Sequence, residues 1–212
     1  IKMEPLNNME SLKNSLSDLW KEVIPKESQL VVIHSSLFHF RLPLEDLEEV
    51  LINSIIDLSE RGLTVALPAF TFSFCKGTPY HFKNSLSETG IWADWLFQSG
   101  KAKRTPHPIY SFVVIGPLSD KIMECKNKTT FGEDSSFEYF ENHRTAFVMF
   151  GCGWEYCTQL HRTEEQLKVP YRFYKEFSGF ADFEEGPQKK SCRMYVHNLE
   201  IGSENDFTSV VD

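Results

Sequence analysis

The stretch that decides the fold is Ala146-Phe147-Val148-Met149-Phe150, followed by Gly151-Cys152-Gly153. An uncharged apolar run of this length predicts a buried strand, and the glycines behind it predict a turn into a helix. Helical spacing then puts His161 and Glu164 on one helix face near the end of that strand. An imidazole beside a carboxylate can take a proton at neutral pH, although such a spacing is more often just a solvated pair on a helix surface.

Strands and helices alternate along most of the chain. The sequence predicts further strands at Leu30–Ile33, Thr64–Leu67 and Tyr110–Ile115. It predicts long helices at Met9–Val23, capped by Asn8, at Leu44–Ser59, closed by Gly62, and at about Glu88–Gln98, followed by Gly100, with short helices at Ser119–Glu124 and Ser135–Glu141. This alternation predicts an α/β fold with three α/β/α layers around a mainly parallel sheet.

The pattern changes after Leu167, where the sequence becomes aromatic and rich in turns. Strands at Arg172–Phe177 and Cys192–Val196 predict a smaller antiparallel addition to the sheet. We therefore expect an α/β core over residues 1–170 and an extension of the same domain over residues 171–212. The ending at Asp212, without a polar tail, suggests that the natural protein continues.

The composition indicates a globular, cytoplasmic protein. With 212 residues, 41% of them hydrophobic, the chain can bury a substantial core. A net charge of -8 argues against nucleic acid or an anionic membrane as the main partner, and it permits a cationic substrate. The five cysteines form no CxxC pair, which argues against a disulfide framework or a zinc ribbon. No segment reads as a signal peptide or a membrane span.

Polar loops follow three of the predicted strands: His34-Ser35-Ser36-Leu37, Pro68-Ala69-Phe70-Thr71 and Gly151 to His161. Because the carboxyl ends of parallel strands share the edge where ligands of open α/β sheets bind, these loops predict one site. Caps and turns explain each serine or threonine taken alone.

A further loop, Arg104-Thr105-Pro106-His107-Pro108-Ile109-Tyr110-Ser111, holds a histidine between two prolines that fix the backbone. Its donors suit a phosphate or an amide-rich ligand. A rigid strand entry with a satisfied histidine explains the loop equally well.

Taken in order, these segments resemble the aminoglycoside 3-N-acetyltransferase family. The resemblance runs from about Leu30 to Arg172 and includes Gly90, Gly116 and the stretch Phe131-Gly132-Glu133-Asp134-Ser135. Its most specific parts are the Arg-x-x-His-Pro-x-x-Ser loop that begins at Arg104 and the Thr-x-x-His-x-x-Glu segment that begins at Thr158. The chain departs from the family at Cys157, where asparagine is common, and it ends earlier than family members usually do.

The resemblance implies transfer of an acetyl group from acetyl-CoA to an amine of an aminoglycoside or a related amino sugar. His161 matches the active-site histidine, the expected general base, and Glu164 matches its partner. The residues expected to bind the cofactor are His34, Ser35, Ser36, Leu37, Thr71, Arg104, His107 and Ser111. Glu133, Asp134 and Glu165 are candidates for substrate binding, although solvation explains the first two as well. No metal is implied.

Three other functions fit the sequence. An acetyltransferase that acts on a nucleotide-linked amino sugar in biosynthesis would use the same residues. A metal-dependent hydrolase could take His34, His107, His161 and Glu164 as ligands, although no close histidine pair supports it. A non-catalytic CoA-binding protein would keep the cofactor loops and function without His161.

Overall fold

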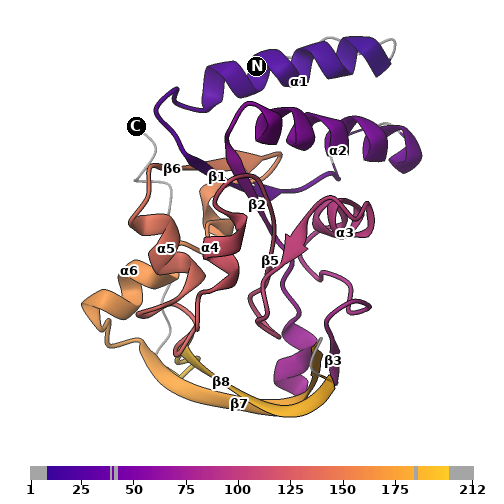
Figure 1. Cartoon of the computed structure of the whole chain (residues 1–212). Coiled ribbons are helices and arrows are strands. Elements are labelled where there is room, and N and C mark those ends of the chain that lie inside the picture. The colour runs from indigo at the N-terminus through magenta and orange to yellow at the C-terminus, as the bar shows by residue number, and fades with distance from the viewer. Residues whose placement is uncertain (1–8, 39, 41–42, 184–185, 201–212) are drawn as a thin grey trace.

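The computed structural model describes residues 9–38, 40, 43–183 and 186–200 and has two sheets (Figure 1). The main sheet has the strand order β4-β5-β2-β1-β6, and the smaller one has the order β3-β7-β8. The strands are β1 (Leu30–Ser35), β2 (Thr64–Pro68), β3 (Tyr80–His81), β4 (Lys103–Arg104), β5 (Phe112–Ile115), β6 (Thr145–Phe150), β7 (Arg172–Phe183) and β8 (Gly186–His197). The helices are α1 (Met9–Val23), α2 (Leu44–Glu60), α3 (Ile91–Gln98), α4 (Ser119–Met123), α5 (Ser136–Glu141) and α6 (Leu160–Leu167), with 3-10 turns η1 (Phe72–Lys76) and η2 (Trp154–Tyr156).

Four strands of the main sheet run in one direction, so the prediction of a mainly parallel sheet is confirmed. β1 pairs in parallel with both β2 and β6. β5 is antiparallel to β2, and β4 is antiparallel to β5, so β4 again runs with β1, β2 and β6. β5 departs from the parallel direction, because a short loop rather than a helix connects it to β4.

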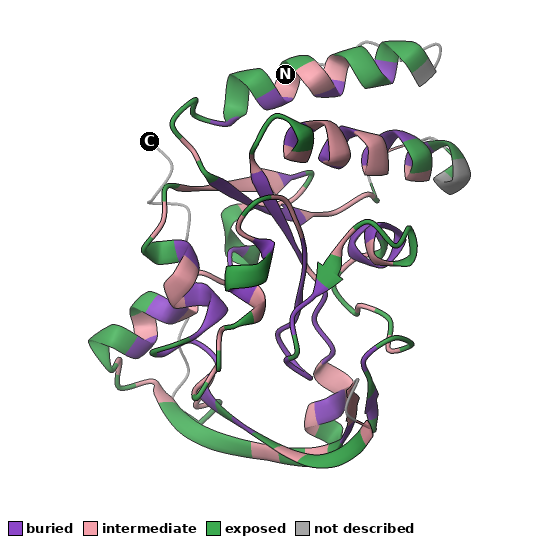
Figure 2. Ribbon diagram, viewed as in Figure 1, coloured by how far each residue is buried: buried purple, intermediate pink, exposed green. Residues whose placement is uncertain are grey.

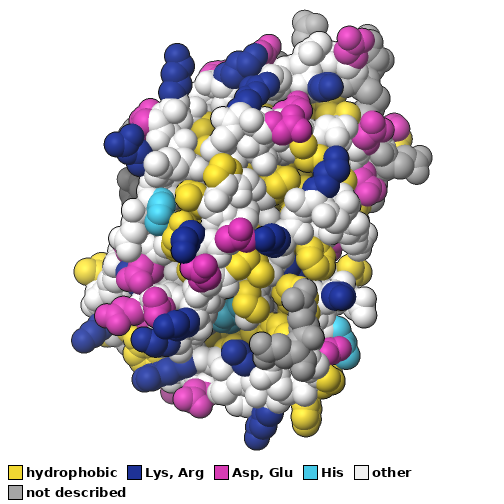
Figure 3. Space-filling model, in the orientation of Figure 1, with side chains coloured by type: hydrophobic (Ala, Val, Ile, Leu, Met, Phe, Trp, Pro, Cys, Tyr) yellow, Lys and Arg dark blue, Asp and Glu magenta, His cyan; other side chains and the backbone are white. Residues whose placement is uncertain are grey.

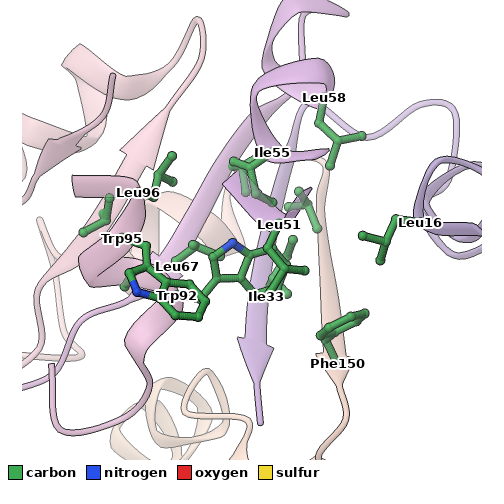
Figure 4. Packing of buried hydrophobic residues seen from close by; sticks show 14 of the residues in the cluster. Leu16, Ile33, Leu51, Ile55, Leu58, Leu67, Trp92, Trp95, Leu96 and Phe150 are labelled. Atoms are coloured by element: carbon green, nitrogen blue, oxygen red, sulfur yellow. The ribbon is translucent and has the colours of Figure 1, made fainter. Parts of the chain in front are cut away.

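Both faces of the main sheet are covered, which confirms the three-layer arrangement. Side chains alternate along β1, so that Val31 and Ile33 belong to one apolar cluster and Leu30 and Val32 to another. The first cluster packs against α1, α2 and α3, and Figure 4 shows it at close range. The second cluster packs against α4, α5 and the smaller sheet.

The long helices form where their apolar periodicity predicted them. In α1 the side chains of Leu12, Leu16 and Trp20 are buried at helical spacing. In α2 the same spacing buries Leu47, Leu51, Ile55 and Leu58. Asn8, the predicted cap of α1, lies outside the described residues. The third helix starts at Ile91 rather than near Glu88, because residues 88–90 form a loop instead of a first turn.

The smaller sheet is a long hairpin that closes one end of the molecule (Figure 1). The predicted strands at Arg172–Phe177 and Cys192–Val196 are confirmed, but each extends to 12 residues. β7 and β8 pair antiparallel over their full lengths, whereas the short β3 joins β7 in parallel. The hairpin exposes much of its outer surface (Figure 2). Its residues Ala181 and Met194 are buried in the second apolar cluster.

Acidic and basic side chains are interspersed over the face of the molecule in Figure 3, so the net charge of -8 does not gather there in one patch. Among the described residues, no helix combines the length and the apolar character that a bilayer crossing requires.

Candidate functional site

The main cavity lies at the carboxyl ends of β1, β2 and β6 and has a volume of about 1010 Å³. Three of the loops singled out in the sequence meet there, as expected for strands that end at the same sheet edge. From these loops the cavity is lined by His34, Ser35, Ser36, Pro68, Phe70, Gly151, Cys152, Gly153, Glu155, Tyr156, Cys157, Thr158 and His161. The strand ends predicted from the sequence therefore indicated where the cavity lies.

Two strand ends are held together by main-chain contacts. Ser36 donates its N–H to the carbonyl of Phe150 over 2.9 Å, which extends the pairing of β1 with β6 by one residue. Gly151 follows with a φ of +70°, and a Cβ at this position would lie 2.5 Å from the Ser36 carbonyl oxygen. A residue with a side chain would strain this turn and collide with the β1 loop, so glycine keeps the two loops in contact.

His161 and Glu164 lie one turn apart on α6 and form a close pair, of which His161 lines the cavity. His161 Nδ1 lies 2.7 Å from Glu164 Oε2, and the two side chains are 28% and 16% exposed. The ring of Phe131 meets the imidazole edge-on at 5.2 Å. No described residue hydrogen-bonds Nε2 of His161, so this nitrogen is available to a ligand in the cavity.

Arg172, the first residue of β7, completes this cluster. Its Nε lies 2.9 Å from Glu164 Oε2, and Tyr171 donates its hydroxyl to Glu164 Oε1 over 3.1 Å. Burial by itself would raise the pKa of Glu164, but the hydrogen bond to His161 and the charge of Arg172 outweigh it. The pKa of Glu164 therefore lies below its ordinary value, and the carboxylate is ionised at neutral pH.

Two buried polar atoms border the cavity without a partner among the described residues. They are Nε2 of His34 and the hydroxyl oxygen of Thr158. Burial lowers the pKa of His34 to about 4, so its imidazole is neutral at pH 7. Buried polar atoms are normally hydrogen-bonded, so both atoms are candidates for a contact with a ligand.

Aromatic rings and carboxylates also line the cavity, and the sequence analysis did not name them as candidate site residues. Phe72 and Tyr110 add ring surface, while the carboxylates of Glu88 and Glu155 border the same space. Glu155 lies inside the Gly151 to Glu164 segment, but only the 3-10 turn η2 shows that it borders the cavity. Glu88 was assigned to a helix, whereas its loop conformation lets the carboxylate accept the Ser73 N–H over 2.9 Å.

Arg104 and Ser111, both expected to contact the cofactor, do not line the cavity. Arg104 is 2% exposed and points into the protein. Its guanidinium donates to the Ser111 hydroxyl at 2.9 Å, to the Ala69 carbonyl at 2.9 Å and to the Ser85 carbonyl at 2.5 Å. Ser111 in turn donates to the Ala69 carbonyl at 2.6 Å. These contacts tie the loop between β4 and β5 to the end of β2.

His107 and Thr71 are engaged in the same loop. Nδ1 of His107 accepts the N–H groups of Ile109 and Tyr110, at 3.1 and 2.9 Å. Burial, helped by the charge of Lys190, lowers the pKa of His107 to about 3, so the ring is neutral. The Thr71 hydroxyl donates to the Pro108 carbonyl over 3.1 Å. Both residues brace the loop and lie outside the cavity lining.

The remaining candidates also lie away from the cavity lining. Leu37 is partly buried against the first apolar cluster. Glu133 is exposed, and Asp134 lies 3.7 Å from Lys128 in an ion pair. Glu165 is buried on α6, where one carboxylate oxygen accepts the hydroxyls of Thr129 and Tyr174.

The structure does not assemble the ligand set of the hydrolase alternative. Within residues 9–38, 40, 43–183 and 186–200, no three His, Cys, Asp or Glu side chains cluster in a way that could hold a metal ion. His107 in particular is occupied by two main-chain donors through Nδ1.

Fold and site together give an α/β protein with a cavity at the carboxyl ends of its strands and a histidine–carboxylate pair beside it. The sequence profile of the aminoglycoside 3-N-acetyltransferase family matches residues 32–212. The chain belongs to this family of acyltransferases, which use acetyl-CoA as the acetyl donor. The resemblance inferred from the loop motifs is thereby confirmed.

Solved structures share the fold at low sequence identity. The YokD protein from Bacillus subtilis is 20% identical with a TM-score of 0.71, over 89% of this chain and 83% of that one. AAC-IIIb in a binary complex with CoASH is 16% identical with a TM-score of 0.77, over 93% and 81%. AAC-VIa bound to sisomicin is 16% identical with a TM-score of 0.72, over 88% and 76%. A comparison with curated protein sequences gave no significant match.

Proposed function

We propose that this protein transfers the acetyl group of acetyl-CoA to an amino group of an aminoglycoside or a related amino sugar, with His161 as the general base. The observation that carries the proposal is that His161 lines a cavity of about 1010 Å³ while its Nδ1 is paired with Glu164. Family membership supports the donor and the type of reaction. The base and the acceptor follow from the residues at the site.

The cavity suits the pantetheine arm of acetyl-CoA. The arm carries amide groups, and the hydroxyls of Ser35 and Ser36 together with the unpartnered Nε2 of His34 offer it hydrogen bonds. Gly90, with a φ of +150°, lies against Ser35, where a Cβ would come within 3.7 Å of the Ser35 carbonyl oxygen. When bound, acetyl-CoA supplies an activated acetyl thioester.

His161 supplies the proton transfer. An acceptor amine is mostly ammonium at neutral pH, so a base must remove a proton before nitrogen can attack a carbonyl carbon. With Nδ1 hydrogen-bonded to Glu164, His161 can take that proton on Nε2 and later return it to the departing thiolate. The buried hydroxyl of Thr158, one turn before His161, can donate to a carbonyl oxygen that gains negative charge.

The acceptor that the lining favours is a cationic amino sugar. Glu88 and Glu155 bring two carboxylates to the cavity, and Phe72 and Tyr156 bring aromatic faces that attract ammonium groups. Sisomicin, the ligand of the structural neighbour AAC-VIa, belongs to this chemical class. A nucleotide-linked amino sugar carries phosphates that these carboxylates would repel, which ranks the biosynthetic alternative second.

The test is a thiol-release assay with acetyl-CoA and either sisomicin or a nucleotide-linked amino sugar. We expect turnover with sisomicin, and His161→Ala should lower kcat by about 100-fold or more, as loss of a general base does. His81→Ala, which removes an exposed histidine, is the matched control and should keep full activity. Calorimetry should give both variants the acetyl-CoA affinity of the wild type. Full activity of His161→Ala would favour a non-catalytic or base-free role and overturn the assignment.

A further inference from the structure

Arg172 in β7 lies behind the His161–Glu164 pair and is held by contacts to α6 and to β8. Its Nε lies 2.9 Å from Glu164 Oε2, and its Nη2 lies 3.0 Å from His161 Nδ1. Its Nη1 donates to the Tyr195 carbonyl in β8 over 3.1 Å. The Arg172 side chain is 8% exposed and does not line the cavity, so it can act on the reaction only through its neighbours.

The nitrogen Nδ1 of His161 can serve only one of its two neighbours. It donates a hydrogen to the Glu164 carboxylate at 2.7 Å, or it accepts one from Arg172 at 3.0 Å. The first arrangement leaves the lone pair on Nε2, where a base needs it. The second places hydrogen on Nε2 and removes the base. The shorter bond to an ionised carboxylate favours the first arrangement.

The charges around the pair determine the electrostatic cost of placing a proton on His161. Glu164 carries one negative charge, and the guanidinium of Arg172, which is always protonated, already balances it. A proton on His161 would therefore leave a net positive charge among three side chains that are 8% to 28% exposed. Without Arg172, the proton would instead complete an ion pair with Glu164 and be retained.

No other charged group competes for this role from the described elements packed around His161. Tyr171 donates to Glu164 from the segment before β7, and Phe131 contributes a neutral ring. The other charged residues of α6 and its surroundings have partners elsewhere: Arg162 pairs with Glu138 and Glu141, and Glu165 accepts from Thr129 and Tyr174. Across the cavity lie Glu155, which is exposed, and His34, which is neutral.

Building on the proposed acetyl transfer, we propose that Arg172 is a positioning residue that supplies the counter-charge of Glu164 and so keeps His161 neutral. The imidazole then holds its hydrogen on Nδ1 and its lone pair on Nε2. As the amine nitrogen bonds to the thioester carbonyl carbon, its N–H bond breaks onto Nε2. The resulting imidazolium lies beside a Glu164 carboxylate that Arg172 already balances, so it passes the proton on to the thiolate that leaves when the C–S bond breaks. Arg172 thus keeps Nε2 of His161 free to accept a proton and makes the release of that proton easier.

The first test measures kcat/KM against pH for Arg172→Gln and Arg172→Lys. Loss of the cation should move the acidic limb of the Arg172→Gln profile upward by about one pH unit, since a charge at this distance shifts a titration by at least that amount. Arg172→Lys keeps the charge, so its acidic limb should stay at the wild-type position. Lys175→Gln removes an exposed cation from the same strand and should leave the whole profile unchanged. A purely structural arginine would lower the plateau without moving the limb.

A second readout does not depend on turnover. The imidazole signals of isotope-labelled histidine are followed by NMR against pH, and His161 is identified by its loss in His161→Ala. The titration midpoint of His161 should rise in Arg172→Gln. The titration midpoint of His161 should fall in Glu164→Gln, because Arg172 then stays beside the ring without its counter-ion. If Arg172→Gln does not fold, Glu164→Gln provides the test in its place.

The outcomes separate the inference from the function on which it rests. An unchanged His161 titration in Arg172→Gln, or an equal shift in Arg172→Lys, overturns the role of Arg172 even if acetyl transfer is active. The expected shifts in a protein that transfers no acetyl group to either acceptor would support the charge arrangement and overturn the proposed function.

Discussion

Replacing Arg104 distinguishes a structural arginine from a cofactor ligand. In Arg104→Met the apolar stem is kept and the buried guanidinium is lost, together with its hydrogen bonds to Ser111, Ala69 and Ser85. Ala69 keeps the Ser111 hydroxyl as a donor, whereas the Ser85 carbonyl and the Ser111 acceptor site lose their partner. Each buried group left without a partner costs about 1–3 kcal/mol, and removal of a buried charged partner costs about 3–5 kcal/mol in total.

Urea unfolding measures this loss. With a slope of about 2 kcal/mol per molar urea, a loss of about 4 kcal/mol moves the midpoint down by about 2 M. Lys101→Met removes an exposed cation three residues earlier and should change the free energy of unfolding by less than about 0.5 kcal/mol. A change below about 1 kcal/mol in Arg104→Met would refute the structural role. A large loss of acetyl-CoA affinity at unchanged stability would instead make Arg104 a ligand.

Two further predictions concern stability. The pKa of His107 is about 3 in the folded chain, against 6.5 for an ordinary histidine, so the unfolded chain binds more protons between these values and stability falls as pH drops from 6.5 towards 3. His107→Asn, whose carbonyl oxygen can accept the same two N–H donors, should flatten this slope by up to about 1.4 kcal/mol per pH unit in urea titrations, and an unchanged slope would contradict the buried neutral ring. Gly151→Ala should lower the thermal midpoint much more than Gly62→Ala, because a Cβ meets the Ser36 carbonyl at 2.5 Å in the first case and nothing within 4 Å in the second. Equal losses would show that only the positive φ matters.

The parts of the fold that local pattern controls could be predicted from the sequence. Apolar periodicity located α1 and α2, and the uncharged run before Gly151 located β6. The direction of β5 could not be predicted, because four apolar residues look the same in either orientation. The direction of β5 follows from the short connection to β4, and the apolar residues themselves do not indicate it.

The candidate site shows the same division. Strand ends bring His34, Ser35 and His161 to one cavity because a sheet aligns them, and the sequence contains that rule. The identity of a polar residue does not reveal the orientation of its side chain. Arg104 and His107 were therefore expected to contact a ligand, but both are buried and contact other parts of the protein. Arg172 gave no signal, because its partners on α6 precede it by 8 and 11 residues and its carbonyl partner follows by 23.

The contact between Arg172 and the Tyr195 carbonyl gives the assembly of the site an order in time. Because chains are synthesised from the N-terminus, β1, β2, β6 and α6 are all made before β8. A nascent chain can therefore close the cavity walls while the guanidinium still lacks its anchor in the last strand. If Arg172 has the role proposed for it, His161 becomes a tuned base only when the hairpin docks, and a late folding step then controls the chemistry of a site whose walls were built earlier.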